Sequence, residues 1–239
     1  MKQILFGVLG VLLSISAFAD DYDDSGPFYA FYHLQVADPV ALVDSMNRFW
    51  SSDCGKQYPA DVALVQESFN GSSLSTHFIV NTFQKSADQA KAAEIMRSCD
   101  AGVQFLQELA TAGSIPTTQY MGFTLIDAND RTKDTVFAKY DIIVGSENQA
   151  AYAASYAKMM KAVFKDSEVR SYGFGAVYYG RDKFTHWLWT GARSIPELTA
   201  IVKQRGAHPA FTIFTNEVSG MRTFVNASQI QMLQVWERQ

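Results

Sequence analysis

Three histidines and one aspartate lie in strand-like segments of this chain and are the residues best suited to chemistry. His77 and His186 each follow a threonine and precede an aromatic residue, while His33 and Asp141 occupy matching places in two other aliphatic and aromatic segments. Two imidazoles with a carboxylate can bind Zn, Cu or Fe, and an aspartate beside a histidine can make the imidazole a general base. The same residues can also make ordinary structural hydrogen bonds, and their spacing is too unspecific for us to assign a metal.

The segments that contain these residues recur along the chain at a nearly constant spacing. The tetrapeptide from Thr76 to Ile79 resembles the one from Thr185 to Leu188 at an offset of 109 residues. Residues 28–36 and 136–144 share Ala, Tyr and Val at an offset of 108 residues. Two matches in the same order indicate an internal duplication of a unit of about 105 residues.

Each half of the chain is predicted to contain the elements β-α-β-β-α-β. Asp38 followed by Pro39 is typical of a helix start, and Asn70-Gly71 is typical of a hairpin turn. The second helix of the first half is predicted to be long and to reach from Ser86 to Leu109. We therefore divide the chain into a leader, 1–19, a first ferredoxin-like repeat, 20–127, a polar linker, 128–134, and a second ferredoxin-like repeat, 135–239.

The expected fold is α+β, with two tandem ferredoxin-like (βαββαβ) repeats packed sheet to sheet as an α+β barrel. One repeat covers only one face of its sheet with helices, so two repeats can cover each other's open faces. From about residue 24 to residue 237, this order of elements resembles the dimeric α+β barrel superfamily in its fused form. The superfamily includes cofactor-free monooxygenases, haem-dependent chlorite dismutases, dye peroxidases and small-ligand proteins, so the resemblance implies a fold and no single activity.

Alternation along the predicted strands assigns candidate residues to the space between the sheets. Successive side chains of a strand point to opposite faces, so Tyr29 and Phe31 share the inner face with His33. The matching inner residues of the second half are Phe137, Lys139 and Asp141. We assign His77 and His186 to the inner face as well, which would bring His33 near His77 and Asp141 near His186 because first and third strands are neighbours in this fold. The candidate ligand-binding residues are His33, His77, Asp141, His186, Tyr29 and Phe31.

The start of the chain has the layout of a secretory signal peptide. Lys2 precedes an apolar run, 4–13, and Ala17-Phe18-Ala19 is a small-x-small cleavage site. The run is shorter than the roughly 20 apolar residues that span a bilayer. We expect an exported protein, periplasmic in a Gram-negative bacterium and otherwise secreted, without membrane association after cleavage. In an oxidising compartment, Cys54 and Cys99, the two cysteines of the chain, are expected to form a disulfide.

Composition and missing motifs narrow the function classes. A hydrophobic content of 48% excludes a disordered chain, and the formal charge of −4 argues against nucleic-acid binding. The sequence contains no H-E-x-x-H, G-x-S-x-G or P-loop motif. We expect the protein to bind a small apolar or aromatic ligand between its sheets. The alternatives are an oxidoreductase, cofactor-free or haem-dependent, and a structural or interaction protein with a filled interior; the sequence predicts neither a cofactor nor an oligomeric state.

Overall fold

Eight antiparallel strands close into a barrel in the computed structural model, which describes residues 26–165 and 171–239. The strands are β1 (Phe28–Gln35), β2 (Asp61–Ser68), β3 (His77–Phe83), β4 (Ile115–Ala128), β5 (Val136–Val144), β6 (Tyr172–Tyr179), β7 (His186–Ala192) and β8 (Arg222–Trp236). The helices are α1 (Pro39–Ser51), α2 (Ser86–Ser98), α3 (Asp100–Thr111), α4 (Gln149–Val163), α5 (Ile195–Ala207) and α6 (Pro209–Glu217).

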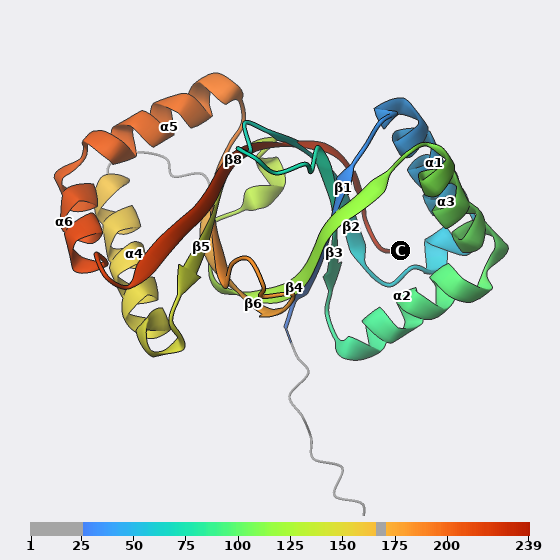
Figure 1. Cartoon of the computed structure of the whole chain (residues 1–239), viewed down its shortest axis with the longest axis horizontal. Coiled ribbons are helices and arrows are strands. Elements are labelled where there is room, and N and C mark those ends of the chain that lie inside the picture. The colour runs from blue at the N-terminus through green and yellow to red at the C-terminus, as the bar shows by residue number, and fades with distance from the viewer. Residues whose placement is uncertain (1–25, 166–170) are drawn as a thin grey trace, which may run out of the picture.

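The barrel consists of two four-stranded sheets of the same topology. Around the barrel the strands follow the order β1-β3-β2-β8-β5-β7-β6-β4, so the halves contribute β4-β1-β3-β2 and β8-β5-β7-β6. The sheets join where β2 pairs with β8 and where β4 pairs with β6. Helices α1, α2 and α3 cover one side of the barrel, and α4, α5 and α6 cover the opposite side (Figure 1). The predicted α+β fold, with ferredoxin-like halves packed sheet to sheet, is confirmed.

The first helix begins where the sequence predicts. The Asp38 carboxylate accepts hydrogen bonds from the backbone N–H groups of Val40 and Ala41, and thereby satisfies two of the amide groups that a helix start leaves unpaired. One stripe of α1, which includes Leu42, Met46 and Phe49, then packs into a fully buried apolar cluster beneath the helices.

The prediction of one long helix from Ser86 to Leu109 is wrong in one respect: the segment forms two helices, α2 and α3. The break falls at Cys99, whose backbone is extended rather than helical. The predicted disulfide between Cys54 and Cys99 is confirmed, with the Cα atoms 6.5 Å apart. The disulfide therefore attaches the α2–α3 junction to the segment that follows α1.

Two glycines of β6 allow large rings to fill part of the barrel interior. Gly173 lies opposite Trp189, and Gly175 lies opposite Trp187, in the β6–β7 pairing. A Cβ atom added at Gly173 would lie 2.0 Å from Cη2 of Trp189, and one at Gly175 would lie 2.2 Å from Cζ2 of Trp187. A side chain at either position would force the indole to move or the strand to shift, so glycine allows the two indoles to pack directly against the strand.

The residues predicted as a signal peptide, 1–19, lie outside the described residues. Within the ranges 26–165 and 171–239, no helix is both long enough and apolar enough to cross a membrane.

Candidate functional site

The barrel interior contains a cavity of about 430 Å³. Its wall is mostly apolar and aromatic, and includes Tyr29 and Phe31 of β1, Phe78 and Val80 of β3, Phe137 of β5, Trp187 and Trp189 of β7, and Ile230 and Met232 of β8. These residues come from both sheets, so the cavity lies between them. Its size falls in the range of small-molecule sites, roughly 300–1,000 Å³. The interior is therefore partly open, which argues against the alternative of a filled barrel.

Charged residues surround the cavity at one end of the barrel. Asp61, Arg131 and Glu237 line the cavity there and are partly or fully exposed. Arg131 forms an ion pair with Asp127, and its Nη2 atom donates a hydrogen bond to the Tyr29 hydroxyl at 2.9 Å. These exposed polar groups mark the opening of the cavity.

A buried lysine lines the cavity within the barrel. The side chain of Lys139 is 4% exposed, and its Nζ atom donates a hydrogen bond to Oδ1 of Asp141 at 2.5 Å. The same Nζ atom lies 5.3 Å from the ring centre of Phe184 and 6.0 Å from that of Tyr120. The ammonium group is thus held by one carboxylate and by the faces of two aromatic rings.

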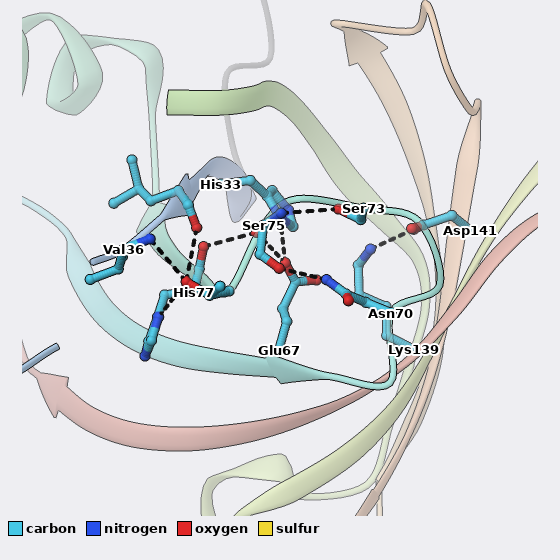
Figure 2. A network of polar contacts seen from close by, with 11 residues as sticks. His33, Val36, Glu67, Asn70, Ser73, Ser75, His77, Lys139 and Asp141 are labelled. Atoms are coloured by element: carbon cyan, nitrogen blue, oxygen red, sulfur yellow. Dashed lines mark hydrogen bonds and ion pairs between the residues drawn. The ribbon is translucent and has the colours of Figure 1, made fainter. Parts of the chain in front are cut away.

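A second polar network is buried beside the lysine (Figure 2). His33 Nδ1 lies 2.9 Å from Glu67 Oε2 and 3.2 Å from Ser75 Oγ, and the Ser75 hydroxyl donates to the same Glu67 oxygen. The amide of Asn70 donates to the Ser75 carbonyl oxygen at 2.6 Å. These hydrogen bonds hold Glu67 and Ser75 in place around one nitrogen of His33.

The electrostatics of this network favour an ionised Glu67. Burial alone would raise the pKa of the Glu67 carboxyl, but the hydrogen bond and charge of His33, the charge of Lys139 and the Ser75 hydroxyl hold it below its ordinary value. An ionised Glu67 accepts the proton of His33 Nδ1 and thereby fixes the orientation of the imidazole ring. His33 Nε2 is buried and has no hydrogen-bond partner among the described residues.

The network is not a serine nucleophile with its base. In such a relay, the serine and the carboxylate bind opposite nitrogens of the histidine ring. Here Ser75 and Glu67 both approach Nδ1, and Ser75 also contacts Glu67 directly. The arrangement instead orients the His33 ring through Nδ1 and leaves Nε2 without a hydrogen-bond partner among the described residues.

Four of the six predicted candidates face the barrel interior. Tyr29 and Phe31 line the cavity, while His33 and Asp141 are buried beside it, in contact with Glu67 and Lys139 respectively. The charge of Lys139 acts on Glu67, so the structure brings the two polar groups together.

The predicted positions of His77 and His186 are wrong. In the pairing of β1 with β3, the residue opposite His33 is Phe78, and His77 lies opposite Leu34 on the helix-covered face. In the pairing of β5 with β7, Asp141 lies opposite Trp187, and His186 lies opposite Ile142. Directly opposed residues of antiparallel strands share a face, so both histidines point away from the barrel interior.

His77 and His186 make equivalent structural contacts on the helix-covered faces of their strands. The hydroxyl of the preceding threonine lies 2.9 Å from Nδ1 of His77 and 2.8 Å from Nδ1 of His186. The same two hydroxyls accept hydrogen bonds from the backbone N–H groups of Val36, which directly follows β1, and Val144, which is the last residue of β5. The Thr-His pattern that repeats along the chain therefore joins neighbouring strand ends.

His186 is also fixed at its second nitrogen. Its Nε2 atom lies 3.0 Å from Oε1 of Gln149 in α4, and its ring stacks on Phe174 with centres 5.0 Å apart. Burial, together with the charge of Arg181, lowers the pKa of His186 to about 4. The neutral ring is thus saturated with hydrogen bonds and has no free position for a ligand.

Glu67, Ser75, Tyr120, Trp187 and Trp189 are site residues that the sequence analysis did not select. Glu67 lies on the same inner face of β2 as Ala63 and Val65. A charged residue in this otherwise apolar series is the sequence feature that could have identified it. Tyr120 is buried, its hydroxyl has no hydrogen-bond partner among the described residues, and burial together with the charges of Asp141 and Glu67 raises its pKa well above the ordinary value.

The cavity wall does not fit a haem group. Haem iron is held in proteins by histidine, cysteine, methionine or tyrosine. The lining contains no histidine or cysteine, and its tyrosine, Tyr29, already accepts a hydrogen bond from Arg131. Met232 lines the wall alone, without a second donor for iron among the lining residues. Within residues 26–165 and 171–239, no group of three or more His, Cys, Asp or Glu side chains is arranged to hold a metal ion.

Comparisons with known proteins identify the fold. No family model and no curated protein sequence matches the chain. Solved structures do match, among them a proposed monooxygenase from Fusobacterium nucleatum subsp. nucleatum, with a TM-score of 0.60, 14% identity and coverage of 89% of this chain and 95% of that one. An anthrone oxidase-like protein has a TM-score of 0.59, 11% identity and coverages of 88% and 93%.

A haem-binding protein from Thermus thermophilus matches with a TM-score of 0.52, 9% identity and coverages of 88% and 92%. These structures belong to the dimeric α+β barrel superfamily, so the fold-level resemblance expected from the order of elements is confirmed. At these identities the likeness shows the fold and no activity.

Proposed function

We propose that the protein binds a small, largely apolar aromatic molecule in the cavity between its two sheets. The observation that carries this proposal is the cavity of about 430 Å³ with a wall of aromatic and aliphatic side chains. Such a wall favours apolar ligands because it removes apolar surface from water and offers ring faces for stacking. The partly exposed charged residues at the opening leave the entrance in contact with solvent.

We further propose that the protein is exported, with residues 1–19 removed as a signal peptide. The sequence pattern of this segment supports export, and the disulfide between Cys54 and Cys99 fits an oxidising compartment. Mass spectrometry of the protein purified from its source would give an N-terminus at Asp20 if this assignment is right, and at Met1 if it is wrong.

Two tryptophans of the wall provide a direct test of binding. Trp187 and Trp189 line the cavity, whereas Trp50 and Trp236 stack on each other at 5.1 Å outside the barrel interior. We expect naphthalene to change the tryptophan fluorescence saturably, and the change to be lost when Trp187 and Trp189 are replaced by Phe.

The matched control fills the cavity. Ala63 lines the cavity, so Ala63→Phe should abolish naphthalene binding while the far-UV circular dichroism stays unchanged. Saturable binding of the same strength in the Ala63→Phe variant would place the ligand elsewhere and contradict the proposal.

A second candidate function is oxidation of the bound aromatic molecule. One specific observation favours it: Phe78 lines the cavity and also stacks on His33, with ring centres 4.8 Å apart, and His33 Nε2 has no hydrogen-bond partner among the described residues. Removal of a proton from a phenol or an activated C–H group of the ligand by His33 requires Phe78 to move aside, because a general base must lie within hydrogen-bond reach of the proton that it takes. The neighbours described as a monooxygenase and as anthrone oxidase-like are consistent with such chemistry.

Dioxygen consumption in the presence of anthrone tests this candidate. A catalyst would consume dioxygen at a rate that depends on the protein concentration and that falls at least tenfold in His33→Gln. A rate equal to that without protein would leave ligand binding as the function.

A further inference from the structure

Lys139 has unused hydrogen-bond donors at the cavity wall. A lysine ammonium carries three N–H donors. Among residues 26–165 and 171–239, Asp141 is the one hydrogen-bond acceptor of Lys139 Nζ. Nζ also lies 5.3 Å from the ring centre of Phe184 and 6.0 Å from that of Tyr120, but rings are weaker partners for a cation than oxygen acceptors. A ligand oxygen in the cavity can therefore complete the hydrogen bonding of this group.

The charges around Lys139 determine which oxygen fits. Its positive charge is already paired with Asp141, and the carboxylate of Glu67 lies close enough for the two charges to interact. A ligand carboxylate would add a third negative charge to the buried carboxylates of Asp141 and Glu67. A neutral carbonyl or phenolic oxygen accepts a hydrogen bond from Lys139 without that repulsion.

The rest of the wall determines the body of the ligand. Phe31, Phe78, Trp187 and Trp189 present ring faces and edges to the cavity, and Val65 and Ile230 add aliphatic surface. A planar ring system can contact these side chains while one oxygen at its inner end reaches Lys139.

We infer that Lys139 selects, among the aromatic molecules that the cavity accepts, those with a neutral carbonyl or phenolic oxygen at one end. This inference rests on the proposed function, since it names the ligand class of the same cavity. Lys139 is then a specificity-determining residue, and the aromatic wall supplies the affinity that the ligand class shares.

Four probes of one ring system test the inference: naphthalene, 2-naphthol, 2-acetonaphthone and 2-naphthoate. Dissociation constants from tryptophan fluorescence are measured for each probe with the wild type and with Lys139→Met. The ratio of the two constants is then compared between probes, because the hydration of the free probe is the same in both titrations and cancels. A hydrogen bond from a charged donor predicts that 2-naphthol and 2-acetonaphthone lose roughly tenfold or more in affinity in the variant. Naphthalene should lose less than twofold.

Lys139→Met leaves Asp141 buried without its partner and can destabilise the fold. The double variant Lys139→Met/Asp141→Leu removes both charges and provides the same comparison in a repacked site. Its folded state is checked by thermal unfolding before the titrations, and the same pattern of ratios is expected.

The outcomes separate the inference from the function on which it rests. If none of the four probes binds the wild type, the proposed function fails and the inference fails with it. If naphthalene binds and all four ratios are equal, the cavity binds ligands but Lys139 does not select them. If 2-naphthoate binds the wild type most tightly and loses most in the variant, the site is an anion site and the neutral-oxygen class is wrong.

Discussion

His33 Nδ1 and Glu67 Oε2 lie 2.9 Å apart inside the barrel, and both side chains are less than one-tenth exposed. Such a buried pair is costly to form because both groups leave water, and it is even more costly to break because one polar group then remains without a partner. Ser75 depends on the same carboxylate oxygen, so Glu67 is the centre of the network.

Replacing Glu67 by leucine should lower the free energy of unfolding by about 3 kcal/mol, since it removes the carboxylate partner of the buried His33 and leaves the Ser75 hydroxyl with the His77 carbonyl oxygen as its acceptor. The double variant His33→Leu/Glu67→Leu should be less destabilised than the sum of the two single variants, because no unpaired imidazole remains. Urea unfolding of the four proteins measures this coupling. Strict additivity of the two single effects would show that the two side chains do not stabilise each other.

Alternation predicted the inner face of the first strand correctly and that of the third strand incorrectly, for a physical reason. In β1 one face carries aromatic residues with His33, and the other carries Ala30 and Leu34, so the two faces differ. In β3 both faces are apolar, with Phe78 and Val80 on one and Ile79 on the other. A strand that is buried on both faces gives no alternation signal, and a shift of one residue then exchanges the faces.

The sequence predicted only some residues of the polar network, for a related reason. His33 and Asp141 belong to strands that correspond in the two halves, so the duplication pattern marked them. Glu67 pairs with His33 across 34 residues of chain, and that contact depends on β3 lying between β1 and β2 in the sheet. Local pattern predicts elements and faces, whereas the partner of a buried charge follows from strand order and register.

Acid should destabilise the protein through His186. The folded-state pKa of His186 is about 4, below the ordinary value of 6.5. Between these two values the unfolded chain binds a proton at His186 and the folded chain does not. The stabilising contribution of neutral His186 is therefore complete above pH 6.5 and is lost as the pH falls toward 4. Unfolding free energies measured across this range should fall less steeply in His186→Gln. Parallel pH profiles of the wild type and the variant would contradict the assignment.

Adding one methyl group at Gly175 should disturb the barrel wall. The new Cβ atom would lie 2.2 Å from Cζ2 of Trp187, so the indole must move or the strand must shift. We expect Gly175→Ala to cost about 1–3 kcal/mol of unfolding free energy, the usual range for overpacking, and to change the tryptophan emission. Trp187→Leu should recover most of the loss in the double variant. A fully stable Gly175→Ala with unchanged emission would contradict the close contact.

The disulfide should stabilise the protein without contributing to ligand binding. Cys54 and Cys99 are separated by 45 residues, and closing a loop of that length restricts the unfolded chain by about 4 kcal/mol in the chain-entropy estimate. The bond joins the segment after α1 to the α2–α3 junction, on the helix-covered side of the sheet and away from the cavity wall. We therefore expect Cys54→Ser/Cys99→Ser to lower the midpoint of urea unfolding strongly while the naphthalene dissociation constant of the folded protein changes less than twofold. A comparable loss of affinity and stability would mean that the helical layer of the first half, and not only the strands, determines the shape of the cavity.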